Sequence, residues 1–251
     1  MRHRVLLLVA CLALALPLAA LAADVKVLTA GAFKQVLLAV QPAFERRTGH
    51  RLVIENDTAG ALQRRVGSGE AFDVVVSSPA SLQPVAARLA AEPPRPLARV
   101  GIGIAVKAGT MPPDISSVDA LRALLLRARG VAMVDPAAGG TSGVYLFRLY
   151  DKLGVGEQVR AKAVLVPGGY SAEKVVSGQA DVAIQQMSEL LPVAGVTVVG
   201  PLPSEVQNYT VYAGAVSASA AQPEAARQLL DALRGPEMTA ILQSKGMEAA
   251  R

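Results

Sequence analysis

Short apolar runs rich in β-branched residues alternate with segments of helical periodicity along most of the chain. In the first part, "VKVLTAG" precedes "FKQVLLAVQPAFERRTG", "RLVIEND" precedes "AGALQRRVGSG", and "FDVVVSS" precedes "SLQPVAARLA". Further on, "GVAMVDP" leads into "TSGVYLFRLYDKLG", "KAVLVPGG" into "YSAEKVVSG", and "DVAIQQ" into "MSELLP". This alternation predicts an α/β fold of mainly parallel sheets covered by helices, and strands that are apolar on both faces are typical of such sheets.

Residues 53–78 and 164–186 resemble each other within the chain. Both run from a strand through a turn of small residues and a short helix to Ser-Gly, and then to Asp-Val at the start of another strand. Gly69 and Gly178 fit helix C-caps, and Asp73 and Asp181 introduce the strands. Two interpretations stay open, because all α/β units look alike: a generic similarity, or two equivalent lobes.

Two proline-rich segments, residues 90–100 and 200–217, are predicted to link the lobes. Two crossings would place the middle of the chain in one lobe and both ends in the other. The expected bounds are 24–100 plus 214–251 for the first lobe and 101–213 for the second. A cleft at the carboxyl ends of the strands is where open α/β sheets bind ligands.

The first 23 residues have the pattern of a secretory signal peptide. Arg2 and Arg4 precede an apolar run broken by Pro17, and cleavage is expected after Ala22 or Ala23. A membrane anchor fits less well, because the run is short and ends in small residues. Lipidation at Cys11 would require an unusually early cut. We therefore expect export to the periplasm.

Composition excludes several kinds of site. Loss of the signal peptide lowers the formal charge from +5 to +3, and no basic cluster is interleaved with aromatic residues, so nucleic-acid binding is not expected. The mature chain has no cysteine and a single histidine, His50, in a polar turn. No metal site built on imidazoles or thiolates, no cofactor and no Ser-His-Asp triad are therefore predicted.

The stretch "VDPAAGGTSGVY", residues 134–145, is a glycine-rich turn that opens a helix. A nucleotide-binding phosphate loop needs a lysine directly after its last glycine, and none is present. Backbone N–H groups and hydroxyls at a helix start can instead hold another anion. The alternative is that Thr141 or Ser142 simply caps the helix, which the turn taken alone favours.

Three other turns between strand and helix carry small or hydroxylated residues. They place Gly31 and Ala32, Thr58, and the segment 169–171 at the starts of helices. Four such turns converging on one cleft would form an anion site without a lysine, because charge-assisted hydrogen bonds are strong. Lys34 and Arg148 lie near these turns but are more simply read as solvated.

The mature chain resembles the periplasmic molybdate-binding proteins of bacterial ABC transporters and their wider solute-binding relatives. The resemblance runs from "ADVKVLTAGAFKQVLLAVQPAFERRTGH" through "GALQRRVGSGEAFDVVVSS" to "PEAARQLLDALRGPEMTAILQSKGM". It implies a two-lobed, type II periplasmic-binding-protein fold. It also implies a monomer, not an enzyme, that captures a molybdate- or tungstate-like oxyanion and delivers it to a permease in the inner membrane.

The sequence departs from the family's ligand-binding pattern. The usual first-turn serine is Ala32, followed by Phe33, whereas Thr58 keeps the second hydroxyl. Gln186 stands where a tyrosine is usual, and Tyr170 is an alternative source of a phenol from a neighbouring turn. Mismatched buried donors cost about 1–3 kcal/mol each, enough to change which anion is preferred. The predicted ligand-binding residues are Gly31, Ala32, Phe33, Thr58, Ala59, Thr141, Ser142, Gly143, Gly169, Tyr170, Ser171 and Gln186.

Three alternatives to oxyanion capture remain open. An organic di- or tricarboxylate could use Tyr170, Gln185, Gln186 and Ser142 across a larger ligand. An exported hydrolase lacks a general base and a G-x-S-x-G nucleophile motif. A ligand-sensing domain of a regulator would need a DNA-binding segment, which the sequence does not contain.

Overall fold

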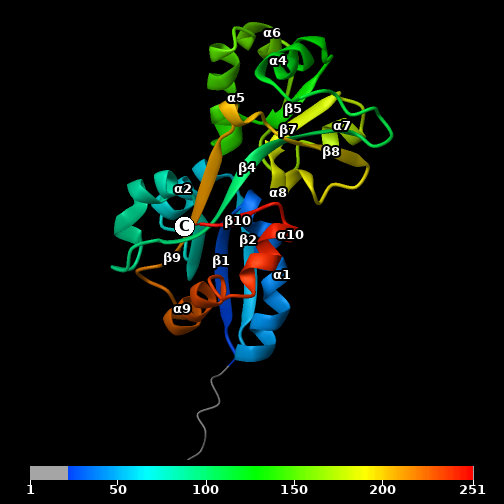
Figure 1. The fold of residues 1–251 in the computed structure, drawn as a ribbon. Coiled ribbons are helices and arrows are strands. Elements are labelled where there is room, and N and C mark those ends of the chain that lie inside the picture. The colour runs from blue at the N-terminus through cyan, green and yellow to red at the C-terminus, as the bar shows by residue number, and fades with distance from the viewer. Residues whose placement is uncertain (1–21, 251) are drawn as a thin grey trace, which may run out of the picture.

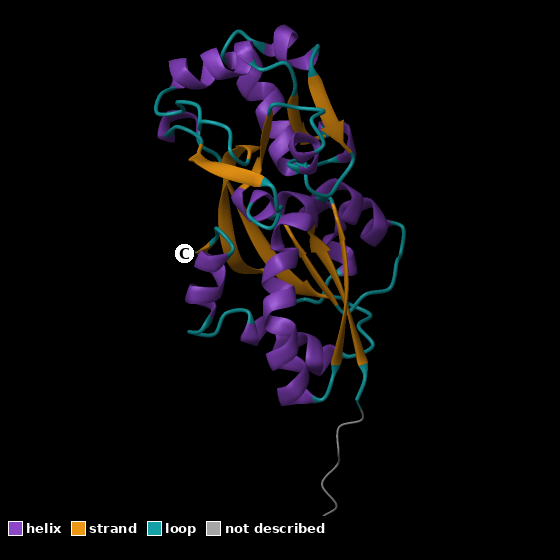
Figure 2. Ribbon diagram, turned by 90° about the vertical axis from the view of Figure 1, so that its right-hand side faces the viewer, coloured by secondary structure: helices purple, strands orange, loops and turns teal. Residues whose placement is uncertain are grey.

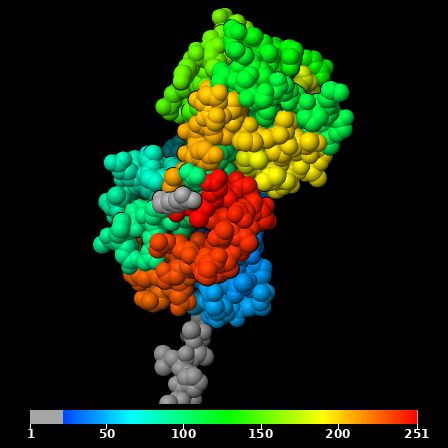
Figure 3. Space-filling model, in the orientation of Figure 1, coloured from blue at the N-terminus to red at the C-terminus, as the bar shows by residue number. Residues whose placement is uncertain are grey.

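A computed structural model describes residues 22–250; the expected signal peptide, including Cys11, lies almost wholly outside the described residues. The described chain forms two lobes stacked end to end, with a constriction between them (Figure 1, Figure 3). One apolar core draws on residues 25–100 and 212–247, which we call lobe 1. The other cores draw on residues 102–206, which we call lobe 2. The α/β, two-lobed fold predicted from the sequence is confirmed.

Lobe 1 is a mixed sheet with helices on its faces (Figure 2). The strands β1, β2 and β3 run parallel, whereas β9 pairs antiparallel with both β3 and β4. Its elements are β1 (Asp24–Ala30), α1 (Gly31–Thr48), β2 (Arg51–Asp57), α2 (Ala59–Gly67), β3 (Val74–Ser77), α3 (Pro79–Leu82), η1 (Gln83–Arg88), the first half of β4 (Arg95–Lys107), β9 (Tyr209–Val216), α9 (Pro223–Ala232), α10 (Met238–Ser244) and β10 (Glu248–Ala249).

Lobe 2 repeats this plan on a smaller scale. The strands β5, β6 and β7 run parallel, and the second half of β4 pairs antiparallel with β7 and β8. Its other elements are α4 (Val118–Arg127), β5 (Val131–Val134), η2 (Pro136–Ala138), α5 (Thr141–Lys152), α6 (Gly156–Arg160), β6 (Ala163–Val166), α7 (Glu173–Val176), β7 (Val182–Gln186), α8 (Met187–Leu190), β8 (Val196–Pro201) and η3 (Ser204–Val206).

The internal resemblance corresponds to matching parts of the two lobes. The strand order β2-β1-β3 in lobe 1 matches β6-β5-β7 in lobe 2. Asp73 Oδ2 accepts a hydrogen bond from the Lys26 backbone N–H at 2.8 Å, and Asp181 Oδ2 accepts one from the Arg129 N–H at 2.7 Å. Each aspartate thus ties the start of one strand to the segment that opens the neighbouring strand. The interpretation as equivalent lobes therefore fits better than a generic similarity.

The segments predicted as proline-rich linkers are largely strands. β4 passes from one lobe into the other as a continuous strand, and β9 returns beside it (Figure 1). The side-chain amide of Gln207 fastens this crossing: its Oε1 accepts from the Ile102 N–H and its Nε2 donates to the Ile102 carbonyl, both at 2.9 Å. Among residues 22–250, no helix is both long and apolar enough to cross a bilayer.

Candidate functional site

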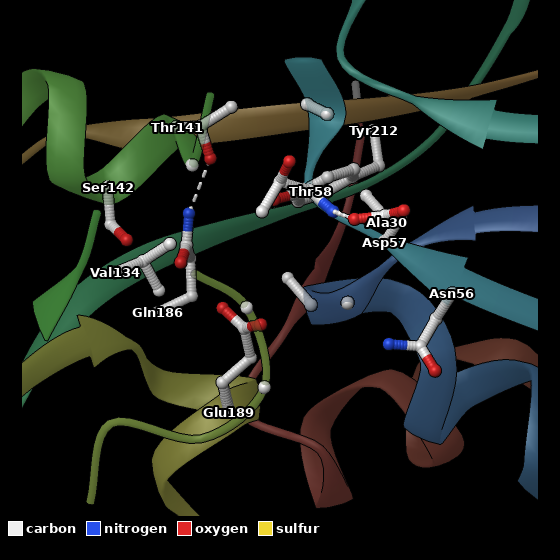
Figure 4. Close-up of a pocket in the computed structure, with 16 residues that line it drawn as sticks. Ala30, Asn56, Asp57, Thr58, Val134, Thr141, Ser142, Gln186, Glu189 and Tyr212 are labelled. Atoms are coloured by element: carbon white, nitrogen blue, oxygen red, sulfur yellow. Dashed lines mark hydrogen bonds between the residues drawn. The ribbon is translucent and has the colours of Figure 1, made fainter. Parts of the chain in front are cut away.

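One pocket lies between the lobes, at the carboxyl ends of strands from both. The residues after β1, β2, β5, β6 and β7 all reach it, as expected for a ligand site of parallel sheets. Its cavity is small in this arrangement, about 30 Å³. The residues lining this interlobe pocket are Ala30, Gly31, Ala32, Asn56, Asp57, Thr58, Ala59, Val134, Gly140, Thr141, Ser142, Gly168, Gly169, Gln186, Glu189 and Tyr212 (Figure 4).

Two helices from opposite lobes begin at this pocket without a side-chain cap. The N-cap residue of α1 is Ala30 and that of α5 is Gly140, and neither makes a side-chain hydrogen bond to its helix. The first N–H groups of a helix have no partner within the helix, and its N-terminus carries partial positive charge. The two helix starts therefore present backbone donors and a positive potential to the same small space.

Neutral polar side chains supplement these donors. Ser142 is 1 % exposed, and its hydroxyl has no hydrogen-bond partner among the described residues. Gln186 Nε2 donates to Thr141 Oγ1 at 2.6 Å, which holds both side chains at the start of α5 (Figure 4). A buried hydroxyl without a partner costs about 1–3 kcal/mol, so an acceptor atom of a ligand would relieve this cost.

Glu189 is a buried acid in this pocket. It is 7 % exposed, and Figure 4 shows its carboxyl between Gln186 and the start of α1. The contact with α1 is close, since a Cβ atom on Gly31 would lie 2.7 Å from Glu189 Oε1. Burial raises the pKa of Glu189 to about 8, partly offset by a hydrogen bond with Gln185. The side chain therefore keeps its proton at neutral pH in the unliganded protein.

The pocket holds no basic side chain among its lining residues. Its other carboxyl group, that of Asp57, accepts the Thr58 N–H at 2.8 Å and lies 3.7 Å from Arg65. Within the part of the chain that the structure describes, no group of three His, Cys, Asp or Glu residues could hold a metal ion. The arrangement suits an anion held by amides and hydroxyls.

The two lobes touch on either side of the pocket. The Gly60 N–H donates to the Gly139 carbonyl at 3.1 Å, and Thr58 Oγ1 donates to the Ala138 carbonyl at 2.5 Å. A Cβ atom on Gly60 would lie 2.8 Å from Gly139 Cα, so only glycine permits this approach. Elsewhere along the interface, Gln35 Nε2 donates to the Tyr170 hydroxyl at 2.7 Å. These contacts define a closed arrangement of the lobes.

The structure brings most of the predicted site residues together. Those that line the pocket are Gly31, Ala32, Thr58, Ala59, Thr141, Ser142, Gly169 and Gln186. The suggestion that Thr141 or Ser142 caps α5 is wrong, because α5 has no side-chain cap. Thr58 does cap α2, accepting the Ala61 N–H at 3.1 Å.

Four predicted residues lie outside the pocket lining. Phe33 is fully buried in the core of lobe 1, with its ring centroid 6.4 Å from that of Tyr212. Gly143 packs against the end of β5, where a Cβ atom would lie 2.1 Å from the Val134 carbonyl oxygen. Ser171 donates through its backbone N–H and its hydroxyl to Gln185 Oε1, at 2.8 and 2.7 Å. Tyr170 belongs to the contact with Gln35 described above. These four residues take part in packing and hydrogen bonds around the pocket and do not face it.

Sequence reasoning missed several lining residues. Asn56 and Asp57 end the predicted strand "RLVIEND", and Glu189 follows the predicted strand "DVAIQQ"; none of the three was among the predicted site residues. Tyr212 comes from β9 in the second expected linker. Neither Lys34 nor Arg148 lines the pocket: Lys34 is half-buried, and Arg148 is exposed beside a neighbouring groove, as expected for a solvated residue.

Replacing Ser142 by alanine is expected to weaken anion binding about 5- to 30-fold, because a hydrogen bond to a charged acceptor contributes about 1–2 kcal/mol. The unliganded protein should melt at the same or a slightly higher temperature. Isothermal titration calorimetry and thermal melting measure the two quantities.

Ser188 provides the matched control for this substitution. Its hydroxyl is also buried without a partner, but it does not line the pocket. Ser188→Ala should leave the affinity unchanged. Equal loss of affinity in both variants would contradict a ligand contact at Ser142.

Comparison with known proteins identifies the family of this chain. The model of the family "Bacterial extracellular solute-binding protein" matches residues 25–248. A curated relative from Pseudomonas sp., named aconitate isomerase, is 34 % identical over 230 residues, covering 88 % of this chain and 86 % of the relative.

Solved structures share the fold at lower identity. The periplasmic molybdate-binding protein of Azotobacter vinelandii has a TM-score of 0.75 and 20 % identity, over 90 % of this chain and 100 % of that chain. A sulfate-binding protein of Mycobacterium tuberculosis has a TM-score of 0.71 and 18 % identity, over 91 % of this chain and 87 % of that chain.

Proposed function

Because this chain belongs to the bacterial extracellular solute-binding proteins, we propose that it captures a small organic polycarboxylate, of the tricarboxylate class, between its lobes. The observation that carries the proposal is the meeting of the uncapped starts of α1 and α5, one from each lobe, at a pocket lined by no basic residue. Contacts made by both lobes favour the closed state, so binding shifts an open–closed equilibrium. Export to the periplasm and delivery of the ligand to an ABC permease complete the proposed role.

A carboxylate ligand is favoured over a tetrahedral oxyanion by three observations. The 34 % identical relative is named for a tricarboxylate, whereas the molybdate- and sulfate-binding structures, at 20 % identity or less, support only the fold. The methyl groups of Ala30, Ala32 and Val134 give the pocket apolar surface for a carbon skeleton. The protonated carboxyl of Glu189 can donate a hydrogen bond to a carboxylate. In the proposed complex the pocket widens around the ligand while the contact between Gly60 and Gly139 is kept, since the cavity is small here.

A thermal-shift panel tests the ligand class. We expect trans-aconitate, cis-aconitate or another tricarboxylate to raise the melting temperature, and molybdate, tungstate, sulfate and phosphate to have little effect. A ligand at 100 times its dissociation constant stabilises the protein by about 2.7 kcal/mol, which the method resolves easily. A rise in melting temperature with molybdate or tungstate alone would favour capture of an oxyanion instead. A rise with neutral solutes only would refute anion capture.

A second candidate function is isomerisation of the bound tricarboxylate. Two observations favour it: the curated relative is named aconitate isomerase, and a titratable carboxyl, that of Glu189, stands inside the pocket. Proton transfer to and from carbon needs such a group. Capture and isomerisation use the same pocket, and turnover measurements distinguish them.

A further inference from the structure

Glu189 is a buried acid of lobe 2 whose carboxyl reaches lobe 1. It comes from α8 in lobe 2, yet its carboxyl lies against the first residue of α1 in lobe 1. It lines the pocket together with the start of α5, so a ligand held by the two helix starts would contact it. The remaining titratable groups that line the pocket are Asp57 and the fully buried Tyr212. No cation in the pocket lining fixes the charge of Glu189.

We propose that Glu189 is the catalytic acid–base that moves a proton between two carbon atoms of a bound unsaturated tricarboxylate. This proposal rests on the proposed function, because it needs a tricarboxylate in the interlobe pocket. It assigns a chemical role to a residue that the sequence did not single out.

The reaction balances without a further reactant. The ionised carboxylate of Glu189 removes a proton from the methylene group next to the carbon–carbon double bond. The electron pair of the broken C–H bond spreads over the allylic carbons and the adjacent carboxylates. The carboxylic acid then returns the proton to the other end of the allylic system, so that the double bond shifts by one position. Nothing is oxidised or reduced, and the cis or trans geometry is set anew at the shifted bond.

The surroundings of Glu189 suit this chemistry. A ligand whose carboxylates face the uncapped starts of α1 and α5 would find preorganised N–H donors where negative charge develops during the reaction, and such donors stabilise that charge. The cross-lobe contacts close the pocket, which keeps water from competing for the proton. Burial raises the pKa of Glu189 to about 8, close to the value that suits transfer in both directions at neutral pH.

The experiment compares the wild type with Glu189→Gln and a surface control, Glu173→Gln. Glu173 is an exposed residue in the first turn of α7. Each protein is incubated in D₂O with trans-aconitate or cis-aconitate, and ¹H NMR follows interconversion of the isomers and exchange of deuterium into carbon positions. Calorimetry measures the binding of each isomer in parallel. Glu189→Gln should bind the isomers within about tenfold of the wild type and lose turnover and exchange by about 100-fold or more; Glu173→Gln should behave like the wild type.

The pH profile supplies an independent readout. Turnover by the wild type should rise about tenfold for each pH unit below the pKa of Glu189 and then level off, because only the ionised form removes the proton. The other titratable lining groups are Asp57 and Tyr212, and burial raises the pKa of the Tyr212 phenol further away from neutral pH.

The outcomes separate the two proposals. Wild-type protein that binds tricarboxylates without turnover or exchange overturns the role of Glu189 and leaves capture intact. Glu189→Gln that turns over at a tenth of the wild-type rate or more also overturns it. If no tricarboxylate binds to the wild type, the proposed function itself fails.

Discussion

Replacing Gly60 by alanine is expected to weaken ligand binding by about 100-fold without unfolding the protein. The added methyl group would meet the Gly139 backbone, with Cβ only 2.8 Å from Cα, and neither segment is a flexible side chain that can move aside. The lobes would then stop short of the closed state, and ligand contacts from one lobe would be lost. A 100-fold loss corresponds to about 2.7 kcal/mol, which is modest for a ligand clamped from both sides.

The folded state should otherwise tolerate this alanine. Gly60 is the second residue of α2, and alanine favours a helix over glycine by up to about 1 kcal/mol. We therefore expect the melting temperature without ligand to stay the same or rise slightly. Small-angle X-ray scattering with saturating ligand should show a more extended particle than the wild type.

Gly67→Ala is the matched control, because it lies in the same helix. A Cβ atom there would lie 3.6 Å from Val85 Cγ1, an ordinary van der Waals distance. This variant should bind as the wild type does. Wild-type affinity in Gly60→Ala would show that the ligand is held without the contact between α2 and Gly139.

Glu189→Gln is expected to stabilise the unliganded protein by about 2–4 kcal/mol at pH 8. Burial raises the pKa of Glu189 to about 8 in the folded state, whereas an unfolded glutamate titrates near 4.5. Below pH 4.5 both states hold the proton and the group has no effect on stability. Between pH 4.5 and 8 the unfolded state releases its proton first, which lowers the free energy of unfolding as pH rises. The glutamine amide does not titrate, so the free energy of unfolding of the variant does not fall in this way as pH rises.

Urea unfolding of both proteins from pH 4 to 8.5 measures the difference. The curves of wild type and Glu189→Gln should meet near pH 4 and separate as pH rises. Glu70→Gln serves as a control of opposite sign, because Arg65 and Lys26 lower the pKa of Glu70 to about 2. That variant should be less stable than the wild type at neutral pH and approach it in acid. A constant difference across the pH range for Glu189→Gln would mean that the carboxyl is not buried in its neutral form.

The sequence predicts the positions of the turns well, because turn chemistry is local. Gly139 and Gly140 lie between the buried strand β5 and α5, and Thr58 stands before a helix that it caps. The carboxyl ends of parallel strands meet at one edge, so these turns were expected to converge. Internal similarity between residues 53–78 and 164–186 further indicated the two related lobes.

What the sequence does not reveal is contact between segments far apart in the chain. The segment "MSELL" reads as an ordinary short helix, and Glu189 becomes a buried acid only because α1 of the other lobe closes over it. Tyr170 was expected in the pocket, but a side chain more than a hundred residues away in the sequence, Gln35, holds its hydroxyl. A useful signal was available in "DVAIQQ", since polar residues that end a buried strand and lead into an acidic turn are typical of ligand sites.

The Gln207 side chain strengthens the pairing of the two strands that cross between the lobes. By pairing with both the N–H and the carbonyl of Ile102, its side chain extends the antiparallel pairing of β4 with β9 by two further hydrogen bonds. We expect β4 and β9 to bend together at this point. We therefore expect opening and closing of the lobes to bend this crossing without changing the register between β4 and β9.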